Sequence, residues 1–322
     1  MITLRATCER WPLREAFTIA RGSKREAIVV VVHAARGDRV GRGEAVPYAR
    51  YGEDPAGVVR AIEKMSGLRS RAELASMPPG AARNAIDLAL WDLEAEERGV
   101  RVWELPGLEA PRACVTAHTI PIRELDETRA LARREAQRAL LKIKAGGDDD
   151  LARIEAVREE APSARLIVDA NEGWRFETLT HLAPRLAELG VELIEQPLPA
   201  GEDAALEGYA SPVPLCADES FHGEPSSLDA LAGRYGAVNV KLDKQGGLTT
   251  AILAIERARA LGLDVMIGTM VATSLAVAPA VLLAPRARWA DLDAAVFVEP
   301  DREPALRYEG SLVHPPEPAL WG

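Results

Sequence analysis

RLIVDAN at residues 165–171 and VELIEQP at residues 191–197 are two short apolar runs that each end in polar residues. An amphipathic segment of helical length separates them. A buried strand, a helix and a second buried strand form a βαβ unit, in which the two strands are parallel and the helix crosses between them. This stretch therefore predicts a parallel α/β fold.

The same unit recurs on both sides of this stretch. Eight apolar runs follow one another, and they are CVTAHTI (114–120), LLKIKA (140–145), RLIVDAN (165–171), VELIEQP (191–197), VPLCADES (213–220), AVNVKLD (237–243), LDVMIGT (263–269) and WADLDA (289–294). Eight consecutive units favour a closed barrel over an open sheet. A helix-like segment follows every run except the last, so we predict a modified (β/α)7β TIM barrel over residues 112–297.

The first third of the chain has a different pattern. IVVVVH at 28–33 begins a strand, turn and strand that end at Val46, as in an antiparallel hairpin. Residues 81–98 place apolar side chains on one face of a helix. We predict an α+β capping domain made of residues 1–111, to which the Pro-rich tail 298–322 returns.

The composition excludes several classes of protein. The chain has 322 residues, with 39 Lys and Arg against 49 Asp and Glu, and a net charge of −10. Because nucleic acids and anionic membranes attract basic surfaces, we expect neither as a partner. No apolar run reaches the ~20 residues of a transmembrane helix, and the N-terminal residues carry too many charges for a signal peptide. Three widely spaced cysteines predict no disulfide framework, so we expect a cytoplasmic protein.

Charged residues stand at the C-terminal ends of six of the eight runs. They are Lys142, Lys144, Asp169, Glu195, Asp218, Lys241, Asp291 and Asp293. A single carboxylate after a strand is commonly only the N-cap of the next helix. However, the steps from Lys144 through the three acids to Lys241 are 25, 26, 23 and 23 residues, close to one βα unit each. We therefore expect all these groups in one barrel mouth, where barrel active sites lie.

The order of these charges suits one kind of chemistry. Asp169, Glu195 and Asp218 offer hard oxygen ligands from adjacent strands, which predicts a Mg²⁺ site. Lys144 and Lys241 come from strands two and six and would face each other across it. A divalent ion and nearby cations stabilise the enediolate that forms when a carboxylate loses its α-proton.

A lysine acts as the base only when part of it is neutral. Lys142 lies two residues before Lys144, on the same face of the strand. We expect this second cation and the metal, together with burial, to lower the pKa of the basic lysine. Lys244 is expected to be a loop cation near the mouth.

The complete set of motifs resembles the enolase superfamily. They are KxK (142–144), DAN (169–171), EQP (195–197), DES (218–220), NxKL (239–242) and the helix ARNAIDLALWDL (82–93). Lysines on strands two and six resemble the muconate-lactonizing-enzyme subgroup. The mandelate-racemase subgroup would instead have a histidine on strand seven, and MIGTM at 266–270 contains none.

The DLD of Asp291 and Asp293 resembles the dipeptide epimerases, in which such a pair binds the substrate ammonium. WPLREAFTIARG, PYARYGED and VNVKLDKQGGLT are similar to L-Ala-D/L-Glu epimerases in particular. The resemblance implies a Mg²⁺-dependent 1,1-proton transfer between Lys144 and Lys241, with Lys142 stabilising the enediolate. It also implies a role in recycling cell-wall peptides. Arg21, with Arg25 as the alternative, would bind the substrate's side-chain carboxylate, and Thr119 is either a substrate contact or a barrel-core residue.

Other functions stay open. Another dipeptide specificity fits the same motifs. N-succinylamino acid racemase, o-succinylbenzoate synthase and muconate cycloisomerase share the lysine pair, but their substrates have no ammonium for Asp291 and Asp293. A catalytically silent, peptide-binding barrel would have no use for two lysines. The oligomeric state is also open, a homo-oligomer included.

Overall fold

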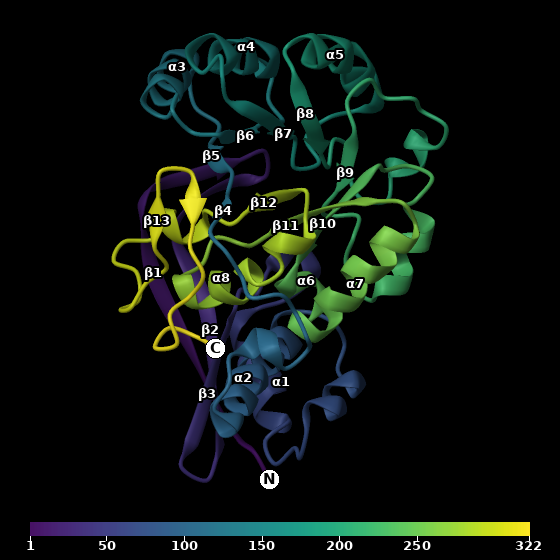
Figure 1. Ribbon diagram of the computed structural model, residues 1–322. Coiled ribbons are helices and arrows are strands. Elements are labelled where there is room, and N and C mark those ends of the chain that lie inside the picture. The colour runs from purple at the N-terminus through teal and green to yellow at the C-terminus, as the bar shows by residue number, and fades with distance from the viewer.

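The computed structural model describes residues 1–322 and contains three sheets (Figure 1). An antiparallel sheet, in purple near the bottom of Figure 1, is formed by β1 (Thr3–Ile19), β2 (Gly22–Arg36) and β3 (Arg39–Ala45). A small sheet joins β4 (Cys114–Val115) to β13 (Tyr308–Glu309) and β14 (Leu312–Val313). The third sheet has eight strands and carries the barrel.

The eight barrel strands are neighbours in chain order and all run parallel. They are β5 (His118–Ile120), β6 (Leu140–Lys144), β7 (Arg165–Asp169), β8 (Val191–Glu195), β9 (Leu215–Ala217), β10 (Ala237–Lys241), β11 (Asp264–Gly268) and β12 (Trp289–Asp291). The two outer strands meet where the backbone N–H of Ala117 donates to the carbonyl of Ala290 at 2.8 Å. The predicted barrel is confirmed.

Helices follow most of the barrel strands. They are α3 (Leu125–Arg134), α4 (Asp150–Glu160), α5 (Phe176–Glu188), α6 (Leu242–Gln245), α7 (Leu248–Ala260) and α8 (Ser274–Val281). After β8 and β9 the prediction of a helix is wrong, because only the 3₁₀ turns η4 (Asp203–Leu206) and η5 (Pro225–Ala230) are present. Pro199 and Gly201 lie in the first of these connections, where they disfavour an α-helix.

The bottom of the barrel is filled with apolar side chains, about one from each strand. This cluster is Ala117, Leu140, Ile167, Leu193, Cys216, Ala237, Met266 and Trp289. Inward-pointing residues of a (β/α) barrel stack in layers. Since side chains alternate along a strand, the next inward layer lies two residues further on, and it contains the charged residues Lys142, Asp169, Glu195, Asp218 and Asp291.

The helix α2 (Ala81–Arg98) packs between the antiparallel sheet and the barrel. It ends at Gly99, which adopts the left-handed conformation with φ of 65°. Its buried Asp87 accepts hydrogen bonds from the backbone N–H and hydroxyl of Thr249, at the start of α7. Its Asn84 donates to Asp243 in α6 at 2.8 Å. Polar residues of α2 thus join the N-terminal region to the barrel.

The C-terminal tail ends against the N-terminal region. The indole N–H of the buried Trp321 donates to the backbone carbonyl of Arg42 in β3 at 2.9 Å. The domain boundaries at residues 111 and 298 stay a prediction. The remaining elements are α1 (Pro55–Lys64), η1 (Ala49–Tyr51), η2 (Arg71–Ser76), η3 (Val102–Glu104), η6 (Ala284–Arg286) and η7 (Ala294–Phe297). No helix is both long enough and apolar enough to cross a membrane.

Candidate active site

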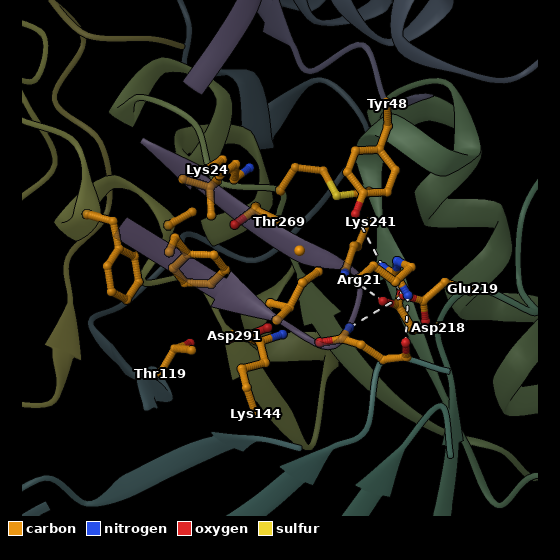
Figure 2. Close-up of a pocket in the computed structure, with 18 of the residues that line it drawn as sticks. Arg21, Lys24, Tyr48, Thr119, Lys144, Asp218, Glu219, Lys241, Thr269 and Asp291 are labelled. Atoms are coloured by element: carbon orange, nitrogen blue, oxygen red, sulfur yellow. Dashed lines mark hydrogen bonds and ion pairs between the residues drawn. The ribbon is translucent and has the colours of Figure 1, made fainter. Parts of the chain in front are cut away.

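A cavity of about 280 Å³ opens at the C-terminal ends of the barrel strands (Figure 2). Seven of the ten predicted site residues line it: Arg21, Thr119, Lys144, Asp218, Lys241, Asp291 and Asp293. The other three, Lys142, Asp169 and Glu195, are fully buried in the charged layer of the barrel. Ligand pockets have volumes of about 300–1,000 Å³, so this one suits a small molecule.

Lys142 lies among three carboxylates. Its Nζ is 3.0 Å from Asp169 Oδ2, 2.6 Å from Glu195 Oε2 and 2.7 Å from Asp291 Oδ2. A buried charge is tolerated only when it is paired in this way. Burial alone would lower the pKa of Lys142, but these carboxylates hold it well above its ordinary value. Lys142 is therefore a fixed cation.

Lys144 and Lys241 lie on opposite sides of the cavity. They end β6 and β10, and three strands of the eight-stranded barrel separate β6 from β10. Lys144 Nζ is 2.6 Å from Asp169 Oδ2, and Lys241 Nζ is 2.7 Å from Asp218 Oδ2. Two amines therefore approach the cavity from two sides, each beside its own carboxylate.

The groups that the protein itself supplies raise the pKa of Lys241, whereas the predicted lowering also counted the metal. Burial lowers the pKa of Lys241, but the carboxylates of Asp218, Glu195 and Glu219 together raise it more, so that the net shift is upward. Burial would likewise raise the pKa of Asp169, but Lys142 and Lys144 hold it below its ordinary value. The prediction counted the neighbouring cation, the metal and burial, but not the acid that pairs with each lysine.

The three predicted metal ligands end neighbouring strands. Glu195 accepts a hydrogen bond from Asn239 Nδ2 at 2.7 Å, whereas its Oε2 is buried and accepts no hydrogen bond of good geometry. Burial, and then the charge of Asp169, raise the pKa of Glu195 to about 8. No group of three or more His, Cys, Asp and Glu side chains is arranged as a ready ligand set, since ammonium groups hold the acids. Three carboxylates at the ends of neighbouring strands still fit a hard divalent cation.

Two residues near the acids were assigned wrongly or missed. Lys244 is not a loop cation at the mouth, because it is fully buried in α6. Its Nζ donates to Asp218 Oδ1 at 2.6 Å and to the carbonyl of Asn239 at 3.0 Å. The side chain of Asn239 was overlooked as a partner of Glu195. It lies two residues before Lys241, the same spacing as between Lys142 and Lys144, and this alternation was the available signal.

Asp291 and Asp293 both reach the cavity. Asp291 contacts Lys142, and Asp293 Oδ2 accepts a hydrogen bond from the backbone N–H of Thr119 at 2.7 Å. Burial, and then the charge of Asp291, raise the pKa of Asp293 to about 7. Thr119 therefore contacts Asp293 and also lines the cavity.

Arg21 and Lys24 both line the cavity, but only Arg21 is paired with acidic side chains. Arg21 is already paired, with Nη2 2.6 Å from Glu219 Oε1 and Nη1 3.1 Å from Glu172 Oε2. Figure 2 shows Arg21 beside Glu219, whereas Lys24 stands apart across the cavity with no partner drawn. Burial, and then Lys144 and Lys241, lower the pKa of Lys24 to about 8. Lys24 was not among the residues predicted from the sequence, and Arg25, the alternative to Arg21, does not line this cavity.

A (β/α)7β barrel with charged strand ends beneath an α+β cap defines an enzyme of the enolase class. Residues 1–107 match the family "Mandelate racemase / muconate lactonizing enzyme, N-terminal domain". Residues 126–319 match "Enolase C-terminal domain-like". The chain belongs to this family.

Two curated relatives are similar over nearly the whole chain. The L-Ala-D/L-Glu epimerase of Escherichia coli (strain K12) is 45% identical, covering 98% of this chain and 100% of the relative. The N-acetyl-D-glutamate racemase of Pseudoalteromonas sp is 42% identical, covering 91% and 95%. Both are isomerases that act on amino acid derivatives, and this chain is an isomerase of that kind.

Two solved structures have the same fold. An enolase family member from Agrobacterium tumefaciens, described as having homology to dipeptide epimerases and with bound sodium and L-Ala-L-Glu, superposes with a TM-score of 0.96. It is 48% identical, and the match covers 100% of both chains. A dipeptide epimerase from Methylococcus capsulatus, complexed with Mg and L-Arg-D-Lys, has a TM-score of 0.89 at 30% identity, covering 98% of this chain and 97% of that one.

Proposed function

We propose that this chain is a Mg²⁺-dependent dipeptide epimerase that inverts the C-terminal residue of L-Ala-D/L-Glu. One observation carries the proposal: Lys144 and Lys241 reach one small cavity from opposite sides of the barrel. Inversion of a carbon requires one group to remove a proton from one face and another to return a proton to the other face. Two single-proton amines on opposite sides meet that requirement.

The lysines exchange protons with the substrate's α-carbon. For one epimer the neutral amine of Lys241 takes the α-proton and the ammonium of Lys144 donates one, and for the other epimer the roles reverse. The carboxylates of Asp169 and Asp218 keep the Nζ of each lysine aimed, at 2.6 and 2.7 Å. Lys142, a fixed cation behind them, stabilises negative charge on the substrate carboxylate.

Asp169, Glu195 and Asp218 would hold the Mg²⁺ ion, and the related Methylococcus capsulatus structure contains Mg. When bound, the ion supplies positive charge that offsets the charge developing on the substrate carboxylate. The donor set fits this ion because it consists of carboxylate oxygens from three neighbouring strands.

Two further contacts explain the choice of a glutamate dipeptide. Asp291 and Asp293 offer carboxylates to the substrate ammonium. Lys24 is a cation in the cavity with no acidic partner, and it binds the side-chain carboxylate of glutamate. The names of both curated relatives refer to glutamate. The dipeptide bound in the Agrobacterium tumefaciens structure, L-Ala-L-Glu, also contains it.

A second candidate is racemisation of an N-acylglutamate. The Pseudoalteromonas sp relative is named for N-acetyl-D-glutamate, and the pKa of about 7 for Asp293 allows a neutral carboxyl that needs no ammonium. We expect Asp291→Asn to reduce kcat/KM for L-Ala-D-Glu by about 10-fold or more, since a buried ammonium would lose a charged partner. N-acetyl-glutamate should be affected much less. Equal losses on the two substrates would remove the ammonium role of Asp291.

The deciding experiment is exchange of the α-proton with D₂O, followed by NMR with Mg²⁺, a small dipeptide library and N-acetyl-glutamate. Exchange and inversion of L-Ala-D-Glu support the proposal. Exchange of N-acetyl-glutamate alone supports the second candidate. A barrel that binds dipeptides without any exchange would be the silent alternative.

Some finer proposals follow from this substrate. Because L-Ala-D-Glu is a piece of the bacterial cell wall, we propose a role in recycling cell-wall peptides in the cytoplasm. The net charge of −10 supports a chain with neither a nucleic acid nor a membrane partner. A homo-oligomer remains an open alternative to a monomer.

A further inference from the structure

We infer that Glu172 is a positioning residue that fastens two separate segments of the N-terminal region over the cavity. Only the predicted effect on the kinetics of the enzyme rests on the proposed function. The two segments are the β1–β2 hairpin, residues 17–25, and the segment 47–53 that contains η1. Glu172 itself belongs to the loop after β7. It neither lines the cavity nor is among the predicted site residues.

The carboxylate of Glu172 receives hydrogen bonds from three parts of the chain. Arg50 in the segment 47–53 donates from Nε at 2.9 Å and from Nη2 at 2.7 Å, one to each carboxylate oxygen. Arg21 in the hairpin donates at 3.1 Å. The backbone N–H of Ala200, after β8, donates at 2.8 Å. The Glu172 side chain is 8% exposed, so these charged hydrogen bonds are partly shielded from water.

The backbone at this point is held in an unusual conformation. Asn171 and Glu172 have φ of 46° and 68°, which non-glycine residues seldom adopt. Such strain persists where surrounding contacts fix it. The carbonyl of Asn171 accepts a hydrogen bond from Arg21 at 2.8 Å, and its N–H donates to Asp169 Oδ1 at 3.0 Å. The same short loop therefore contacts the N-terminal hairpin on one side and the carboxylate at the end of β7 on the other.

The two fastened segments form much of the cavity's lining. Arg21 and Lys24 come from the hairpin, and Tyr48 and Tyr51 come from the segment 47–53. Tyr48 also accepts a hydrogen bond from Arg21 Nη2 at 3.2 Å, so the segments touch each other. Through Arg21 and Arg50, Glu172 is the one carboxylate that contacts both of these segments.

The inference predicts a particular kinetic change. Loosening the lining weakens substrate binding in the ground state and in the transition state alike, and this raises KM with little change in kcat. We expect Glu172→Gln to raise KM for L-Ala-D-Glu by about 10-fold, the factor that corresponds to about 1.4 kcal/mol. A change in kcat of less than about 3-fold is expected, because the lysines stay in place.

The test combines these kinetics with backbone hydrogen exchange of the substrate-free chain. In Glu172→Gln, amides of residues 17–25 and 47–53 should exchange faster than in the wild type. Arg50→Ala removes a half-exposed partner and should accelerate mainly 47–53, because Arg21 stays bound to Glu219. The matched control is Glu155→Gln, which breaks a Glu–Arg pair with Arg185 on the outer helices and should alter neither segment nor KM.

Unchanged exchange of both segments in Glu172→Gln would overturn the inference. Faster exchange with an unchanged KM would also overturn it, because the carboxylate would then be structural only. A wild-type chain that does not invert L-Ala-D-Glu would defeat the proposed function instead. In that case faster exchange in Glu172→Gln still supports the fastening, and unchanged exchange still overturns it.

Discussion

Three lysines line the cavity, and each meets a different electrostatic environment. Lys144 pairs with Asp169 and Lys241 pairs with Asp218, whereas Lys24 has no acidic partner. A paired lysine is held in one direction, as a proton-transfer group must be. An unpaired lysine in a cavity is available to a ligand anion. The same residue type therefore serves two purposes in one cavity.

Removing one of the paired lysines should separate proton removal from inversion. We expect Lys241→Ala to lower the epimerisation rate by about 10²–10⁴-fold, the usual contribution of a general acid or base. Lys144 should still remove and return the α-proton of one epimer, so that this epimer alone exchanges with D₂O without inverting. Proton NMR of each epimer with each variant measures both processes. Lys144→Ala should show the opposite preference, and wild-type inversion in either variant would refute the two-base assignment.

Lys24 should give glutamate recognition a pH dependence. Below its pKa of about 8 the side chain is a cation that attracts the second carboxylate, and above that pH it becomes neutral. The ratio of kcat/KM for L-Ala-L-Glu to that for L-Ala-L-Gln should therefore fall as the pH rises through 8. The two substrates share every other ionisable group, so the ratio isolates the side chain. Lys24→Met should give a low ratio at all pH values, and a wild-type ratio that is flat with pH would contradict the contact.

At the level of secondary-structure elements, the sequence predicted the features that repeat along the chain and missed the features that occur only once. Strand ends recur at nearly constant spacing, so the spacing alone was enough to place Lys144, Asp169 and Lys241 at the same end of the barrel. The roles of Arg21 and Lys24 depend on how a hairpin lies over the barrel, which no periodicity encodes. The absence of helices after β8 and β9 was missed for a similar reason, because loop chemistry decided it rather than apolar spacing.

The contact between β3 and α2 gives a testable case of element packing. A Cβ on Gly41 would lie 2.2 Å from the carbonyl oxygen of Ala89 and 2.2 Å from the backbone nitrogen of Leu93. Because these are backbone atoms, the helix itself would have to move. We expect Gly41→Ala to lower the free energy of unfolding by about 1–3 kcal/mol, as overpacking does. Urea denaturation measures this, with Gly236→Ala as control, since a Cβ there meets only one atom at 4.0 Å.

An equal effect of the two glycine substitutions would mean that the close approach of β3 to α2 does not set the cost. Activity of the folded Gly41→Ala enzyme should change little, because neither element supplies a side chain to the cavity. The packing of this helix therefore matters to stability more than to chemistry.

Over the whole molecule, one buried cluster joins the cap, the barrel and the tail. Glu44 of β3 is fully buried and accepts hydrogen bonds from the hydroxyl and N–H of Thr273, at the start of α8. Arg302 of the tail pairs with the same carboxylate at 2.6 Å and with Glu9 at 2.8 Å. The cavity lies between the cap and the barrel, so this cluster supports the arrangement on which the site depends.

Arg302→Ala should destabilise the molecule as a whole, because it leaves Glu44 buried without its cation. The expected loss is about 3–5 kcal/mol of unfolding free energy, the usual effect of breaking a buried ion pair. Burial raises the pKa of Glu44 above its ordinary value of 4.5, and Arg302 opposes that rise. A carboxyl with a raised folded-state pKa loses stability as the pH rises above its unfolded value. The deficit of the variant should therefore be larger at pH 8 than at pH 5 in urea denaturation. The control is Arg307→Ala, which breaks an exposed pair with Glu309 and should cost less than about 1 kcal/mol. A similar cost for Arg302→Ala and Arg307→Ala would show that the tail adds no stabilising buried ion pair to the fold.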